Sequence, residues 1–184
     1  MRHTVGLVVS ACVMATAACK KGETEARSPE DATVNVPATS PGGTATTIHL
    51  VVEGGKHAGT YDAKSSDITC SYGITGPGTW GNQYSVTGKK PNEFSSLQLI
   101  IPDAKDAADG TDEFLMTVGF GELFKEGYSE HVIDSQKKSS TKKGSGTITV
   151  DDRKTGGKVT FKGKAEDGTS LEGTIDCHQL LRSE

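Results

Sequence analysis

Aromatic side chains and long apolar runs are scarce in this 184-residue chain, in which aromatic residues make up 5% and hydrophobic residues 33%. Beyond its first 18 residues no segment approaches the roughly 20 apolar residues of a membrane-spanning helix. A basic excess is also lacking, since 20 basic residues face 24 acidic ones. The length favours one domain over a multidomain enzyme. The acidic balance gives no general attraction to nucleic acid.

Motifs of known catalytic chemistry are missing as well. The sequence contains no GxSxG elbow, no HExxH pair and no Ser, His and Asp order that suggests a triad. The segment GPGTWG at 76–81 formally matches the dinucleotide fingerprint. That fingerprint needs a helix N-terminus after it, whereas Pro77 and the following NQYSV indicate a loop leading into a strand. We therefore expect no enzyme and no cofactor.

Candidate metal ligands are scattered along the chain. His49 and His178 occupy positions that alternate with core-facing residues, which favours exposed strand histidines over a zinc site. The other two histidines beyond the first 18 residues are His57 and His131. The acidic segment PDAKDAADGTDE favours a solvated loop, because Lys105 and Ala107 stand where a calcium loop needs oxygen ligands. Its carboxylates are Asp103, Asp106, Asp109, Asp112 and Glu113.

The N-terminus has the three parts of an export signal. Arg2 and His3 form a short basic region, residues 5–18 are apolar, and the polar run KKGETEARSPED follows. About 14 residues would rise only roughly 21 Å as a helix, less than the roughly 30 Å of a bilayer core. A cleaved signal is therefore expected rather than a permanent span.

The small residues TAA at 16–18, directly before Cys19, resemble the lipobox of bacterial lipoproteins. The resemblance implies removal of residues 1–18 and attachment of a diacylglycerol to the Cys19 thiol. Cys12, after VSA, is an alternative site that would leave a very short apolar core. A plain secretory signal cleaved near Ala18 is the other alternative. Within the resemblance, Lys20 favours the outer membrane over retention at the inner one.

Residues 19–45 combine the candidate lipidated cysteine with a flexible tether. The segment contains no aromatic residue and is rich in Thr, Ala, Glu, Pro and Gly, so it cannot bury enough apolar surface to fold. We assign residues 46–181 to a β domain and 182–184 to a C-terminal tail. Four parts therefore follow one another along the chain.

Short alternations of apolar and polar residues from Thr46 onward predict an all-β fold, a single antiparallel β-sandwich or small barrel. We expect no helix of 12 residues or more. In the last hairpin, two apolar faces coincide only if the loop around EDGTS has an odd length. Gly163 and Gly173 then make room for bulky neighbours. The candidate strands are 46–52, 68–72, 83–87, 95–101, 113–119, 128–134, 146–151, 158–165 and 170–178.

Cys70 and Cys177 remain in the domain once the first two cysteines are assigned to the signal and the lipid. Two leftover cysteines in an exported protein predict one disulfide, with separate buried thiols as the alternative. The lipobox, the tether, Cys70 on an early strand and GKVTFKGKAEDGTSLEGTIDC are together similar to the mycobacterial lipoprotein antigen family. That similarity implies a sandwich-like surface lipoprotein without known catalysis.

Two loops stand out. QKKSSTKKGS carries four lysines, which favour a soluble turn that discourages edge pairing; contact with anionic lipid or polysaccharide is the alternative. In FGELFKEGY, the apolar residues Leu123, Phe124 and Tyr128 favour packing over an open end of the sandwich. The alternative is an exposed contact site for a ligand or partner.

Taken together, these features predict a lipid-anchored protein of the bacterial cell envelope that acts as a non-catalytic binding or interaction module. Its expected contacts are the membrane, through the lipid, and an envelope ligand or protein partner, with no nucleic acid. A structural envelope component and a hydrolytic enzyme are the alternatives.

Overall fold

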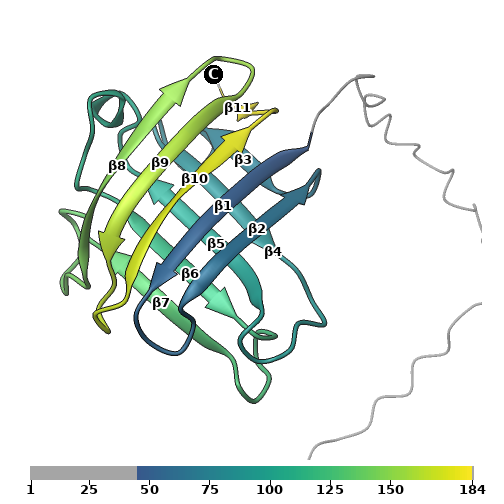
Figure 1. Ribbon diagram of the computed structural model, residues 1–184. Coiled ribbons are helices and arrows are strands. Elements are labelled where there is room, and N and C mark those ends of the chain that lie inside the picture. The colour runs from purple at the N-terminus through teal and green to yellow at the C-terminus, as the bar shows by residue number, and fades with distance from the viewer. Residues whose placement is uncertain (1–44, 184) are drawn as a thin grey trace, which may run out of the picture. The chain divides into compact units, whose positions relative to one another are not determined.

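A computed structural model describes residues 45–183 as two stacked β-sheets (Figure 1). Sheet A has the strand order β2-β1-β10-β9-β8 and sheet B the order β11-β3-β4-β5-β6-β7. The sheets are separate, so the architecture is the sandwich of the two alternatives and not the barrel. In sheet A, β1 is Thr46–Glu53, β2 Gly59–Ser65, β8 Ser145–Asp152, β9 Gly157–Lys164 and β10 Ser170–Cys177. In sheet B, β3 is Thr69–Tyr72, β4 Trp80–Ser85, β5 Phe94–Ile101, β6 Leu115–Phe120, β7 Ser129–Asp134 and β11 Leu181–Arg182.

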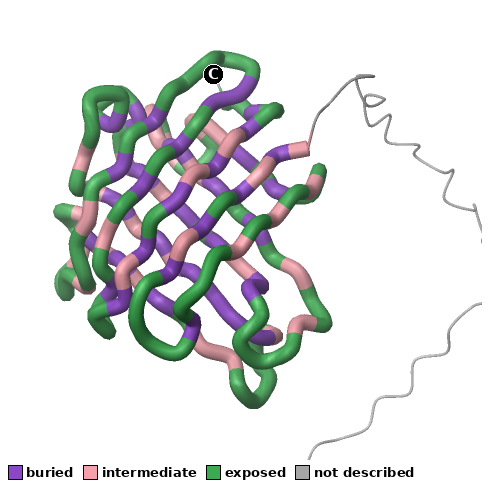
Figure 2. Tube along the Cα trace, in the orientation of Figure 1, coloured by how far each residue is buried: buried purple, intermediate pink, exposed green. Residues whose placement is uncertain are grey.

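The alternation seen in the sequence is the alternation of burial. In β1, Ile48, Leu50 and Val52 point into the core, while His49 and Glu53 are exposed. Figure 2 shows the same alternation of buried and exposed residues along the strands of both sheets. The strands enclose one core whose largest fully buried side chains include Trp80, Phe114, Phe120 and Phe161. The scarce aromatic residues are therefore concentrated between the sheets.

The last hairpin has the predicted parity. Lys164 pairs with Ser170, which leaves residues 165–169 as an odd-length loop. A Cβ added at Gly163 would lie 2.7 Å from Ile133 Cδ1, and one at Gly173 would lie 2.8 Å from Phe161 Cζ. Both distances are shorter than van der Waals contact allows. The two glycines therefore make room for bulky neighbours, as the sequence predicted.

Three features differ from the sequence-based expectations. The edge strand β2 was not predicted, because Tyr61 and Ala63 are its only inward apolar residues. A short 3₁₀ turn, Asp106–Ala108, interrupts the acidic loop. Arg182 belongs to β11, and the Ser183 amide donates to the Tyr72 carbonyl oxygen. The folded domain therefore continues beyond residue 181, into the segment that the sequence assigned to a tail.

Candidate functional site

The loop between β6 and β7, residues 121–128, presents its apolar side chains to solvent; we call it the contact loop. Phe124 is 93% exposed and Leu123 is 51% exposed. Backbone hydrogen bonds from Lys125 to Glu122 and from Tyr128 to Lys125 shape the turn around them. The sequence favoured packing of this segment over the sandwich. That interpretation is wrong for Phe124, which covers no part of the core.

Tyr128 behaves differently from the two residues at the tip. Its ring lies against Gly119 of β6, where an added Cβ would stand 2.8 Å from the phenol oxygen. The hydroxyl donates to Glu130 Oε2 at 3.2 Å, and burial raises the pKa of Tyr128. Tyr128 therefore packs on the outer face of sheet B, at the C-terminal end of the contact loop.

The backbone of Phe124 adopts a left-handed conformation with a φ of 65°. Such a φ is an outlier for a bulky side chain, because the Cβ crowds the neighbouring carbonyl oxygen. The side chain gains no packing in return. Backbone strain of this kind tends to mark sites of function, so folding alone does not explain a phenylalanine at this position.

Directly beneath the contact loop, four side chains form a hydrogen-bonded series that we call the histidine cluster. Ser129 Oγ lies 3.1 Å from His57 Nε2, and His57 Nδ1 lies 3.0 Å from His131 Nε2. His131 Nδ1 lies 2.7 Å from Asp167 Oδ2. Both imidazole rings are buried, with His57 3% and His131 5% exposed. The cluster joins the β1–β2 loop, β7 and the β9–β10 loop, and so links sheet A to sheet B.

The order of these contacts fixes which ring nitrogens carry protons. The Asp167 carboxylate accepts a hydrogen bond, so His131 Nδ1 donates to it. His131 Nε2 is then the acceptor for His57 Nδ1–H, and His57 Nε2 is the acceptor for the Ser129 hydroxyl. With both rings neutral, every hydrogen bond of the cluster therefore points from Ser129 toward Asp167.

Electrostatics agrees with a neutral His57 and a charged Asp167 carboxylate. Burial, followed by the neighbouring His131 and Lys56, lowers the pKa of His57, although a hydrogen bond with Asn92 and the charge of Asp167 oppose that shift. Burial by itself raises the pKa of Asp167, but hydrogen bonds from the Thr169 backbone amide and from His131 outweigh it and hold that pKa below its usual value. The cluster therefore carries its negative charge at Asp167 and no positive charge on His57.

The cluster holds both ends of the contact loop. Phe120, which precedes the loop, stacks on His57 with ring centroids 4.1 Å apart and an angle of 3° between the ring planes. Ser129, which follows the loop, is hydrogen-bonded to the same imidazole. The Tyr61 hydroxyl donates to the His57 carbonyl oxygen at 2.9 Å and so holds the backbone of that residue. His57 therefore contacts the residues on both sides of the contact loop.

Ser129 hydrogen-bonded to a histidine has the order of a nucleophile and its base. One cavity of about 340 Å³ is lined in part by Val51, Lys162 and Glu172. Another, of about 570 Å³, is lined in part by Tyr72, Lys105 and Lys158. Neither of these cavities has Ser129 or His57 in its lining. The contacts of the cluster with the residues on both sides of the contact loop support a positioning role.

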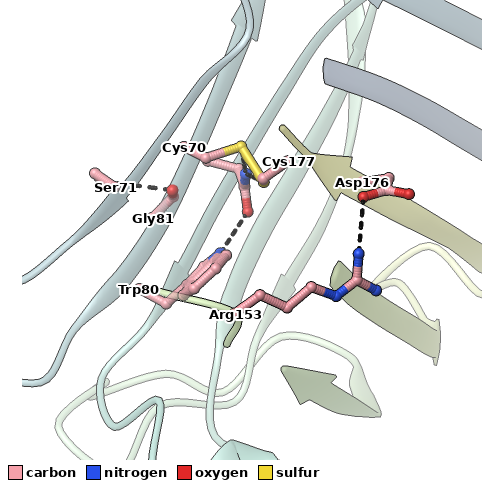
Figure 3. Close-up of a disulfide and its surroundings, with 8 residues drawn as sticks. Cys70, Ser71, Trp80, Gly81, Arg153, Asp176 and Cys177 are labelled. Carbon is pink, nitrogen blue, oxygen red and sulfur yellow. Dashed lines mark hydrogen bonds and ion pairs between the residues drawn. A yellow bond between two sulfur atoms is a disulfide. The ribbon is translucent and has the colours of Figure 1, made fainter. Parts of the chain in front are cut away.

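A second connection between the sheets is covalent. Cys70 of β3 and Cys177 of β10 form the predicted disulfide, with their Cα atoms 6.1 Å apart. Asn82 donates its side-chain N–H groups to both sulfurs and accepts a hydrogen bond from Trp80 Nε1. Figure 3 shows Trp80 below the disulfide and the Arg153–Asp176 ion pair beside it. This disulfide corner is packed and fully hydrogen-bonded.

Other predicted sites show no convergence. Within residues 45–183, no group of three or more His, Cys, Asp or Glu side chains is placed to hold a metal ion. His49 and His178 are exposed, as predicted. The first four residues of GPGTWG form the turn before β4, and its last two, Trp80 and Gly81, begin that strand. The lysine-rich loop places Lys137 against Glu113 and Lys143 against Glu166. Asp103 Oδ1 accepts hydrogen bonds from the backbone amides of Lys105 and Asp106.

The signal, Cys12, the candidate lipidated Cys19 and nearly all of the tether lie outside the described residues. Among residues 45–183, no helix is long and apolar enough to cross a bilayer. Comparisons with protein-family models, with curated proteins and with solved structures found no match for the chain. Function is therefore inferred from the side chains themselves.

Sequence analysis did not predict the histidine cluster, although the sequence contains one indication that His131 is buried. His131 and Ile133 share a face in the predicted strand 128–134, and Ile133 is a core residue. A histidine on a core face needs a hydrogen-bond partner. The partners lie 74 and 36 residues away, in the loops that hold His57 and Asp167. No local pattern identifies those loops.

Proposed function

We propose that this chain is a lipid-anchored binding protein of the bacterial envelope, which docks a protein partner through Leu123 and Phe124. The observation that carries the proposal is the 93% exposure of Phe124 on a left-handed backbone. Exposed aromatic side chains with few rotatable bonds are frequent energetic anchors of protein interfaces. Glu122, Lys125 and Glu126 surround the anchor with charge, as the polar rim of an interface does.

An apolar pocket on a protein is the partner that best fits this tip. The two adjacent side chains project from a narrow turn, whereas a flat glycan would require a platform of polar and aromatic groups around them. A membrane surface would favour a net positive tip, and the contact loop instead has two Glu and one Lys between its glycines. Glycan and lipid are therefore the alternative ligands, and the experiment below distinguishes them from a protein partner.

Lipid attachment is tested by growth with labelled palmitate. The wild-type chain should incorporate the label, Cys19→Ser should abolish it, and Cys12→Ser should leave it unchanged. Labelling that depends on Cys12 would move the anchor to the alternative site. Labelling of neither cysteine would leave a secreted protein and remove this part of the proposal.

Docking is tested with the proposed mature chain shortened by Cys19, residues 20–184, which carries no lipid and is mixed at pH 7 with envelope vesicles from cells that lack the protein. Phe124→Ala should weaken saturable binding by more than tenfold, a change of about 1.4 kcal/mol. The controls Ile74→Ala and Leu181→Ala remove other exposed apolar side chains, which are 55% and 51% exposed. They should bind like the wild type.

Protease treatment of the vesicles separates the classes of partner. Loss of binding after treatment supports a protein partner. Binding that survives treatment points to glycan or lipid and contradicts the proposal, and so does equal binding by wild type and Phe124→Ala. A structural envelope component is the remaining alternative, and it predicts no dependence on the contact loop.

A further inference from the structure

We infer that the histidine cluster is an acid-sensitive latch that holds the contact loop in its docking conformation at neutral pH and releases it in mildly acidic surroundings. The inference rests on the proposed function for its biological meaning. The latch itself is a property of the free protein and is tested without a partner.

The geometry places His57 against both ends of the contact loop. Phe120 and Ser129 both contact one imidazole, at the two positions where the contact loop leaves sheet B and returns to it. The same two residues pair with each other in the β6–β7 ladder, and the Gly121 amide donates to the Glu93 carbonyl oxygen at 2.9 Å. Displacement of His57 would therefore remove one contact from each end of the loop and loosen both ends together.

An added proton acts on this support at His57 Nε2, the nitrogen that accepts the hydrogen bond from the Ser129 hydroxyl. The serine would have to rotate and accept that bond, and His57 would carry a positive charge although it is only 3% exposed. Burial of this charge next to Lys56 costs free energy. Opening of the loop would relieve that cost.

Charged and titratable groups reach His57 from each neighbouring element. The β9–β10 loop contributes Asp167, which stabilises a proton on His57, and the β1–β2 loop contributes Lys56, which opposes it. The β4–β5 loop contributes the neutral amide of Asn92, and β2 the phenol of Tyr61. From sheet B the neighbours are Phe120 and Ser129, neither of which carries a charge. The carboxylate of Asp167 contacts His131 rather than His57, so it compensates a charge on His57 only in part.

The sign of the pH dependence follows from the lowered pKa of His57. In the unfolded or released loop, His57 titrates at its ordinary pKa near 6.5. The closed state binds fewer protons between that value and the lower folded pKa. Closure is therefore at full strength above about pH 6.5 and weakens as the pH falls through the folded pKa.

Amide hydrogen exchange of the lipid-free chain, residues 20–184, tests the latch. The Gly121 and Tyr128 amides should lose at least tenfold in protection factor between pH 7 and pH 5. Two controls report on the rest of the fold: the Lys143 amide, bonded to Asp134, and the Ser183 amide, bonded to Tyr72. Both should keep their protection. Simultaneous loss at all four amides would indicate general acid unfolding and overturn the latch.

Two surface variants give opposite shifts and leave the buried rings in place. Lys56→Gln removes a positive charge near the pair, so the closed loop tolerates the proton better and the midpoint pH of release should fall. Asp167→Asn removes the carboxylate that stabilises the proton, while keeping an acceptor for His131, and should raise that midpoint. Asp62→Asn is the matched control, since Asp62 contacts the exposed His49 at 2.7 Å, and should leave the midpoint unchanged.

Unshifted midpoints in both variants, or Gly121 protection that does not change with pH, would refute the latch. Vesicle binding at pH 5 should be at least tenfold weaker than at pH 7 if the latch and the docking function both hold. Exchange that follows the prediction without any dependence of binding on Phe124 would keep the latch and reject the docking function. Binding that depends on Phe124 without acid-sensitive exchange would keep the docking function and reject the latch.

Discussion

Two of the connections between the sheets use opposite chemistry. At the disulfide corner, Cys70 and Cys177 make a covalent bond that Asn82 and Trp80 surround with hydrogen bonds. At the histidine cluster, His57 and His131 make the connection through hydrogen bonds alone. Their attachment points in sheet B, β3 and β7, are separated by β4, β5 and β6. One junction is therefore covalent, whereas the other is built from side chains that can take up protons.

Position explains why the two junctions differ. The disulfide corner lies far from the contact loop in the sheet order, since β3 and β7 are separated by three strands. The histidine cluster contacts the residues on either side of that loop. The covalent bond therefore secures the scaffold, and the hydrogen-bonded cluster supports the loop for which docking is proposed.

Removal of the disulfide should have the largest effect. Cys70→Ala with Cys177→Ala opens a cross-link between residues 107 apart, which in the chain-entropy model corresponds to about 4–5 kcal/mol of stability. Urea denaturation at pH 7 and at pH 5 should show the same loss at both values. A loss below about 1 kcal/mol, or free thiols in the oxidised wild type, would contradict the assigned role.

A smaller and pH-dependent loss is expected at the other junction. His57→Phe retains stacking on Phe120 but leaves Ser129 and His131 without their partner, which should cost about 1–3 kcal/mol at pH 7. Because the lowered pKa of His57 weakens the wild type below pH 6.5, the difference should shrink at pH 5. If urea titrations show the same difference in unfolding free energy between wild type and His57→Phe at pH 7 and pH 5, the histidine cluster is no more sensitive to pH than the disulfide.

The two Asp–His pairs of the domain sharpen the comparison further. His131 is buried beneath Asp167, whereas His49 is half exposed beside Asp62. Asp167→Asn should lower the free energy of unfolding at pH 7 by about 1 kcal/mol, after allowance for a half-exposed carboxylate. Asp62→Asn should change it by no more than about 0.5 kcal/mol. The reverse order in denaturation experiments would contradict the assignment of the buried pair as the structural one.

The smallest effect is expected at the tip of the contact loop. Phe124→Ala should change stability by no more than about 0.5 kcal/mol, as at ordinary exposed sites. Phe124→Gly should raise it by up to about 1 kcal/mol, because glycine relieves the left-handed backbone. Lys154→Gly, at a φ of 68°, is the matched control. A loss of 3 kcal/mol or more for Phe124→Ala, typical of a buried phenylalanine, would show that the residue belongs to the core.

Local patterns in the sequence predicted the scaffold well. Alternation located β1, the hairpin parity gave the register of β9 and β10, and elimination among four cysteines gave the disulfide. Edge strand β2 escaped because an edge strand needs little apolar surface to pair with β1. The local sequence is sufficient to predict strands such as β1, because the alternation of apolar and polar residues along a strand decides which face is buried.

The candidate site was much less predictable. His57 follows a turn, GGK, and Asp167 lies in a turn, EDG, so each resembles an ordinary loop residue. Only the pairing of distant strands brings them to His131. For Phe124, hydrophobicity favoured burial, and the backbone conformation that turns it outward has no sequence signature. Tertiary proximity, rather than residue type, defines this site.

The disulfide also determines what a single cut in the chain would do. Cys70 and Cys177 close a covalent ring that contains the whole contact loop, while β1, β2 and the N-terminal segment precede the ring in sequence. A protease that cleaves after Lys125 would open the ring without separating any fragment. The chain on both sides of the cut would stay attached to the N-terminus until the disulfide is reduced.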